Sequence, residues 1–95
     1  MSVKMQKVYD IAKKIERGLL ATDKRFNREV KLIHEDGSVI YFSDAFILYL
    51  NTAETDSWIL CFTEHHGFHI YPEEDLLSFR QLERIGIENV PSENL

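Results

Sequence analysis

The chain has 95 residues and a formal net charge of −5, with 44% hydrophobic and 12% aromatic residues. This length fits a single domain over residues 1–95, and the hydrophobic content is sufficient for a core. No apolar run approaches the ~20 residues that span a bilayer, and the apolar residues near the N-terminus are interspersed with charges, unlike those of a signal peptide. We expect a cytoplasmic protein, and the single cysteine, Cys61, favours this because it cannot form an internal disulfide.

The charge is distributed unevenly along the chain. Residues 1–50 carry 9 Lys/Arg and 7 Asp/Glu, a net charge of +2, whereas residues 51–95 carry 2 Arg and 9 Asp/Glu, a net charge of −7. General nucleic-acid binding is disfavoured because it depends on clustered cations that neutralise phosphates. A local exception is a candidate basic face formed by Lys4, Lys7, Lys14 and Arg17.

Residues 3–20 are predicted to form an amphipathic helix. Apolar residues recur at spacings of three and four, which places them on one stripe that we expect to dock on a sheet. The stripe consists of Val8, Ile11, Ala12, Ile15 and Leu19, with Met5 beside it.

Residues 29–42 are predicted to form a β-hairpin. Two apolar runs flank a three-residue loop that ends in Gly37, which is expected to take a positive φ. Counting outward from this loop pairs Leu32 with Ile40 and Val30 with Phe42. Residues 43–44 are polar and are expected to turn or kink the chain before a further strand at residues 45–50.

A second hairpin is predicted around the His-rich turn. Residues 58–63 are rich in β-forming side chains, and residues 65–67 again read as a three-residue loop that ends in Gly67. This count pairs Phe62 with Ile70 and Cys61 with Tyr71. It also places Cys61 and His69 on the same face of the sheet.

The C-terminal part allows two interpretations. Pro72 followed by three acidic residues favours a short helix that begins there and ends near Gly86. Alternatively, residues 72–75 form a tight turn and the alternating Leu77, Ser78, Phe79 and Arg80 form a strand, so residues 76–82 are helix or strand. Residues 91–95 are expected to be a frayed tail.

The predicted fold class is α+β. We expect the N-terminal helix to pack on a roughly five-stranded, mainly antiparallel sheet, followed by the short C-terminal helix. If the last segment is a strand instead, the chain becomes a helix plus a small β-barrel with a superficial SH3-like or Sm-like topology.

Potential site chemistry is concentrated in the His-rich turn. Glu64, His65, His66 and His69 are suitable ligand types for zinc or another transition metal, with Cys61 nearby. Neighbouring turn histidines tend to point apart, and no pair of closely spaced cysteines supplies a closed ligand set. We therefore expect no bound cofactor and assign no catalytic residue, because no nucleophile motif or phosphate-binding loop is present.

Three functions remain open from the sequence. We favour a protein-protein interaction or homodimerisation module, because aromatic-rich strands offer sheet edges and apolar patches to a partner. One alternative is a nucleic-acid-associated accessory protein that uses the basic N-terminal helix. The other is a metal-binding protein at His65, His66 and His69.

Overall fold

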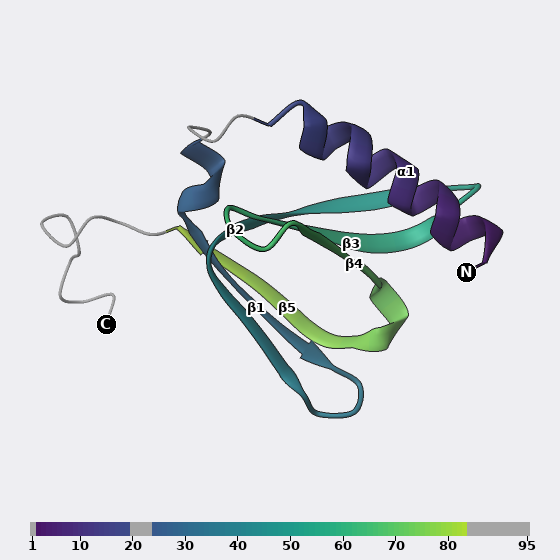
Figure 1. Cartoon of the computed structure of the whole chain (residues 1–95). Helices are drawn as coiled ribbons and strands as arrows, with labels where there is room; N and C mark the ends of the chain where they lie inside the picture. Colours follow the sequence, from purple (N-terminus) through teal and green to yellow (C-terminus); the bar gives the residue numbers. More distant parts are fainter. Residues whose placement is uncertain (1, 20–23, 84–95) are drawn as a thin grey trace, which may run out of the picture.

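The computed structural model describes residues 2–19 and 24–83, and it shows one helix and a five-stranded antiparallel sheet (Figure 1). The α+β class is therefore confirmed. The elements are α1 (Val3–Arg17), η1 (Lys24–Asn27), β1 (Arg28–His34), β2 (Val39–Thr52), β3 (Asp56–Thr63), β4 (Phe68–Pro72), η2 (Glu73–Asp75) and β5 (Leu76–Glu83). No helix in the described part of the chain is long and apolar enough to cross a membrane.

The N-terminal helix begins at a side-chain cap and ends near Gly18. The Ser2 hydroxyl accepts a hydrogen bond from the backbone N–H of Met5 at 3.0 Å, which satisfies one of the donors left open at a helix start. The predicted stripe faces the sheet as expected at Val8 and Ala12, which are fully buried. Ile15 and Leu19 pack at the margin of the same cluster.

The first hairpin has the predicted register. Leu32 pairs with Ile40, Val30 pairs with Phe42, and Gly37 has a φ of 91°. The predicted kink at residues 43–44 is an irregularity inside one long strand. Two β2 residues, Ser43 and Asp44, lie between the partners of Val30 and Arg28, whereas only one β1 residue, Glu29, lies between Val30 and Arg28 themselves. The two runs predicted as separate strands are thus one 14-residue strand, β2.

The second hairpin forms, but its predicted register is wrong by two residues. Cys61 pairs with His69 and Phe62 pairs with Phe68. The loop begins one residue earlier than predicted, because the backbone N–H of Thr63 donates to the carbonyl of Gly67 at 2.9 Å. Gly67 has a φ of 71°, as expected. A shift of two residues preserves the face, so the prediction that Cys61 and His69 share a side of the sheet is confirmed.

The predicted C-terminal helix is wrong. Only the three-residue 3-10 turn η2 follows Pro72, and residues 76–83 form β5, which pairs antiparallel with β1. The alternative prediction of a strand at this position is therefore correct. The predicted end of the helix near Gly86 and the frayed tail at residues 91–95 lie outside the described residues.

The strand order is β4-β3-β2-β1-β5, so β4 and β5 are the two edges of an open sheet. The long strand β2 joins two halves: its first part pairs with β1 and its second part pairs with β3. Because β4 and β5 do not pair within the described residues, the sheet does not close into a barrel. In Figure 1 the β1–β2 hairpin extends away from α1, with β5 beside β1.

Two apolar clusters lie on opposite faces of β3. The helix-side core joins α1 to the sheet and contains Val8, Ala12, Phe26, Phe46, Trp58, Leu60 and Phe62. The inner core lies on the other face and contains Val30, Leu32, Ala45, Ile59 and Cys61. The strand β3 is therefore covered on both sides, which explains why its sequence is apolar from Trp58 to Phe62.

Candidate binding surface

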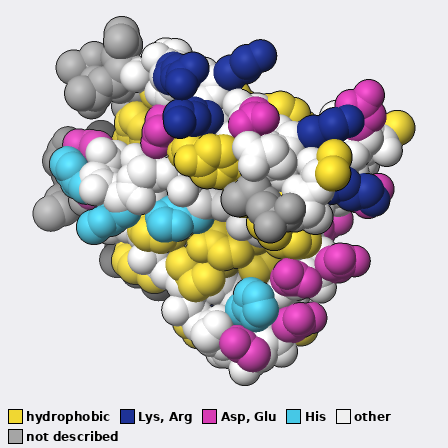
Figure 2. Space-filling view, turned by 45° about the vertical axis from the view of Figure 1, so that its right-hand side comes forward, with side chains coloured by type: hydrophobic (Ala, Val, Ile, Leu, Met, Phe, Trp, Pro, Cys, Tyr) yellow, Lys and Arg dark blue, Asp and Glu magenta, His cyan; other side chains and the backbone are white. Residues whose placement is uncertain are grey.

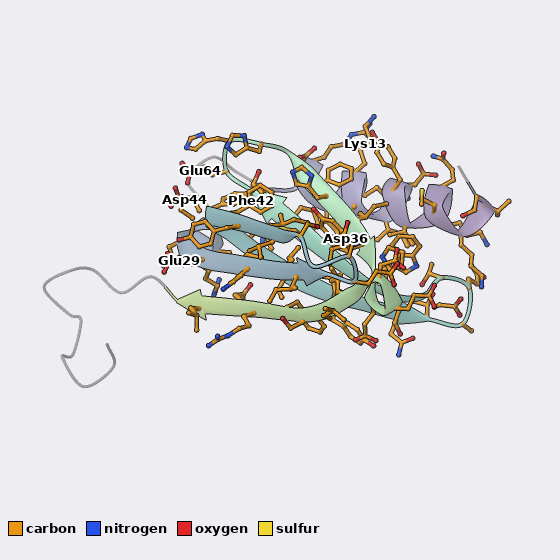
Figure 3. All side chains as sticks on the ribbon, turned by 90° about the horizontal axis from the view of Figure 1, so that it is seen from below. Lys13, Glu29, Asp36, Phe42, Asp44 and Glu64 are labelled. Atoms are coloured by element: carbon orange, nitrogen blue, oxygen red, sulfur yellow. The ribbon has the colours of Figure 1, made fainter. Side chains whose placement is uncertain are left out.

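The His-rich turn is held by its own backbone and by Thr63. The Thr63 hydroxyl donates to the carbonyl of Gly67 at 2.7 Å and accepts from the backbone N–H of His66 at 2.7 Å. These bonds leave His65 and His66 exposed at the tip. Glu64 lies close to Asp44 on β2 (Figure 3), since its backbone N–H donates to the carbonyl of Asp44 at 2.9 Å.

The structure does not bring the candidate metal ligands together. His69 lies on β4, where its ring stacks on Phe42 with centroids 5.0 Å apart, and its Nε2 is buried without a hydrogen bond to a described residue. His65 Nε2 instead lies 3.4 Å from Glu64 Oε1 at the turn. Among residues 2–19 and 24–83, no three His, Cys, Asp or Glu side chains are placed to hold a metal ion. On the side of the molecule shown in Figure 2, the histidine side chains lie at separate positions.

Cys61 does not supply reactive chemistry beside His69. Burial raises the pKa of its thiol to about 12, so the side chain keeps its proton at neutral pH. Burial also raises the pKa of the neighbouring Tyr71 hydroxyl. Both groups therefore remain neutral, and the side of β3 and β4 that carries them is an apolar packing surface.

The candidate basic face on α1 is partly neutralised. Lys4 Nζ lies 2.5 Å from Asp56 Oδ2, and Lys7 Nζ lies 3.1 Å from Glu54 Oε2. The hydrogen bond to Asp56 raises the pKa of Lys4 above its ordinary value. Lys14 and Arg17 are exposed nearer the C-terminal end of the helix. Figure 2 shows Lys and Arg side chains along the top of the molecule and acidic side chains below them on the right.

Two hollows of the described surface, of about 570 and 580 Å³, border α1. One cleft of about 570 Å³ lies between the start of α1, the β2–β3 turn and η2. Its walls include Lys4 and Asp56, which pair with each other, and Trp58, whose indole N–H donates to the carbonyl of Thr55 at 2.5 Å. The charges of Lys4 and Asp56 thus neutralise each other, and the indole N–H of Trp58 is already bonded, so these three groups are not available to orient a small ligand.

A different surface lies on the half of the sheet that α1 does not cover. We call it the outer face: the side of β1, β5 and the first part of β2 that points away from the inner core. Side chains alternate along these strands, so the neighbours of the buried Val30 and Leu32 point outward. The outer face consists of Glu29, Lys31, Ile33, Val39, Tyr41, Ser78, Arg80 and Leu82.

The outer face and the adjoining edge strand carry several large apolar side chains that are exposed. Val39 is 58% exposed and Tyr41 is 54% exposed on β2. On the edge strand β5, Leu77 is 67%, Phe79 37% and Leu82 53% exposed. Three of the seven large hydrophobic residues that are exposed in the described part thus lie on β5. Isolated exposed apolar residues are ordinary, whereas a group of them on an edge strand indicates a contact surface.

The sequence reasoning missed this surface because it placed residues 76–82 in a helix. The available signal was the alternation of Leu77 and Phe79 with Ser78 and Arg80, which supports a strand. No family model, curated protein or solved structure matches the chain. The function therefore has to be inferred from the geometry of the chain itself.

Proposed function

We propose that this protein is a small cytoplasmic interaction module that binds an extended segment of a partner protein along the free edge of β5. The observation that carries the proposal is the group of exposed apolar side chains, Leu77, Phe79 and Leu82, on an eight-residue edge strand. The backbone of an edge strand offers unpaired N–H and C=O groups, and an added strand satisfies them. The cytoplasmic location is supported by the single cysteine, which is buried.

The two edges of the sheet differ in the way that this proposal requires. The strand β4 is only five residues long and ends at Pro72, which has no N–H to donate. Its flank is also occupied, because Tyr9 of α1 packs on Phe68 with ring centroids 5.2 Å apart. Short length, proline and coverage are common protections of an edge against pairing. The strand β5 has none of them within its described residues.

The exposed apolar side chains of β5 would add affinity and specificity to the main-chain hydrogen bonds of an added strand. Main-chain hydrogen bonds give an added strand its orientation, while pockets or apolar patches for alternate side chains supply specificity. Phe79 lies opposite the fully buried Leu32, so an apolar side chain next to Phe79 would extend the inner core past β5. Leu82 and Tyr41 provide contact area on the outer face.

The test is a selection of binders followed by mapping. Random peptides displayed on phage are selected against the purified protein, and amide hydrogen exchange is measured with and without the selected peptides. We expect slower exchange in residues 76–83 and loss of binding in the Leu82→Lys variant, while the matched Val3→Lys variant on exposed α1 still binds.

Two results would contradict the proposal. One is protection that maps to α1 or to the His-rich turn and leaves β5 unchanged. The other is the failure of every selected peptide to discriminate Leu82→Lys from the native protein. Light scattering on the same samples shows whether a second copy of the chain, and not a foreign segment, occupies the edge.

A further inference from the structure

Two cations lie side by side on the outer face. Lys31 on β1 is directly opposite Arg80 on β5, and both side chains are exposed. Directly opposed residues of antiparallel strands have Cβ atoms about 5 Å apart, and like charges at that separation destabilise the pair. Neither side chain forms an ion pair or hydrogen bond with another described residue. Within the described residues, the fold therefore holds two adjacent positive charges without an ion-pair partner beside the free edge of β5.

The acidic residue of the outer face, Glu29, is hydrogen-bonded to Tyr41 and forms no ion pair with either cation. Glu29 precedes Lys31 by two residues on β1, and one of its carboxylate oxygens accepts a hydrogen bond from the Tyr41 hydroxyl. Tyr41 in turn lies opposite Lys31 on the side away from Arg80. Tyr41, Lys31 and Arg80 thus form one row across three strands, and the row ends at the edge where a further strand would add.

A second copy of this chain is a poor occupant of that edge. Two identical strands pair antiparallel about a twofold axis perpendicular to the sheet, so the outer faces of both copies lie on the same side. In the registers that pair most of β5, Arg80 of one copy would be opposite or diagonal to Arg80 of the other. A Lys31 would stand behind each arginine, and this row of four cations disfavours pairing.

We infer that the partner segment is an extended, acidic strand with alternating character, an inference that rests on the proposed function. One set of its side chains shares the outer face, where a carboxylate opposite Arg80 neutralises the cation pair. The other set shares the side of Phe79, which is 37% exposed, and is apolar. A sequence that alternates acidic and β-branched residues satisfies both requirements at once, because the side chains of a strand alternate between the faces.

The experiment compares labelled peptides of about nine residues, which is within the usual range of strand lengths and enough to span β5. The first alternates valine with glutamate, the second alternates valine with lysine, and the third alternates valine with serine. Affinities for the native protein are measured by fluorescence anisotropy at low and high salt. We expect the glutamate peptide to bind about tenfold or more tightly than the serine peptide, with an advantage that shrinks as salt screens the charges.

Variants that reverse the charge of Arg80 or Lys31 test whether these two residues attract the peptide. The Arg80→Glu and Lys31→Glu variants are each expected to lose about tenfold in affinity for the glutamate peptide and to gain affinity for the lysine peptide. The matched Lys14→Glu variant changes the net charge equally on α1 and should retain the native preference. Thermal melts of each variant show whether the fold is intact.

The outcomes separate this inference from the proposed function. If all three peptides bind equally well and protect β5 from hydrogen exchange, the edge is a docking site but its acidic preference is wrong. If the glutamate peptide binds without protecting β5, or binds Lys14→Glu as weakly as Arg80→Glu, the attraction is only that of the overall charge and the inference is overturned. If no peptide protects β5, the proposed function fails as well.

Discussion

Replacement of Val8 by aspartate tests how α1 is attached to the sheet. Val8 is fully buried in the helix-side core. Loss of its apolar burial costs about 1.5–3 kcal/mol. The new carboxyl has no described cation in that cluster, so it must take up a proton, and a pKa shift of about 3 units adds about 4 kcal/mol. The sum, about 6 kcal/mol, is a large part of the roughly 5–14 kcal/mol expected for 95 residues.

The assay is urea unfolding followed by circular dichroism at several pH values. The folded-state pKa of the new aspartate is raised, so its penalty is absent below the ordinary aspartate pKa and grows as the pH rises. The Val8→Asp variant should therefore lose about 6 kcal/mol of unfolding free energy at neutral pH and regain most of the ionisation part, about 4 kcal/mol, at about pH 4. Gln6→Asp, on the exposed side of the same turn, should stay within about 0.5 kcal/mol of the native protein. Near-native stability of Val8→Asp at neutral pH would refute the packing described above.

Three further predictions concern the turns and the inner core. Gly67→Ala should destabilise by about 1 kcal/mol because φ is 71° there, whereas Gly18→Ala, at a φ of −83°, should be neutral or stabilising; calorimetry that ranks them the other way would contradict the turn geometry. Cys61 has a pKa raised by burial from 9.0 to about 12, so its contribution to stability is present below pH 9 and is lost as the pH rises toward 12. The unfolding free energy of Cys61→Ala, measured by denaturation, should fall less steeply with pH over that range than that of the native protein. An equal pH dependence in both proteins would argue against thiol burial. Gln81→Leu should lower the unfolding free energy by about 1 kcal/mol, since the side-chain oxygen of Gln81 accepts from the backbone N–H of Ile47 at 2.6 Å. Gln81→Glu keeps an acceptor and should cost less, and equal losses in the two variants would show that this hydrogen bond does not contribute to stability.

The sequence predicted the elements that depend on local signals. The register of the first hairpin was predicted correctly because Gly37 ends a short turn, and the length of that turn fixes which flanking residues pair. The helix α1 was predicted correctly because its apolar residues recur at regular spacings. The same count from the glycine gave the wrong register for the second hairpin. There the hydroxyl of Thr63 forms hydrogen bonds inside the turn, and the turn begins one residue earlier than predicted. A side-chain bond of that kind leaves no trace in apolar periodicity.

Long-range pairing decided the features that could not be predicted. Residues 73–75 suit a helix start, yet β1 offers a free edge, and pairing along β5 overrides the local preference of an acidic turn. The same pairing creates the candidate site, because Lys31 and Arg80 are 49 positions apart in the chain and become neighbours only through the register. The histidines that stand out in the sequence are separated by the turn and by the stacking of His69 on Phe42.

The most direct test of the central claim is an NMR measurement of the protein with the peptide of alternating valine and glutamate. We predict Hα–Hα contacts between the peptide and β5, including Ser78 or Arg80, of the kind made only by adjacent antiparallel strands. Contacts confined to α1 or to residues 64–67, with β5 unperturbed at saturation, would contradict the claim that this edge is the binding surface.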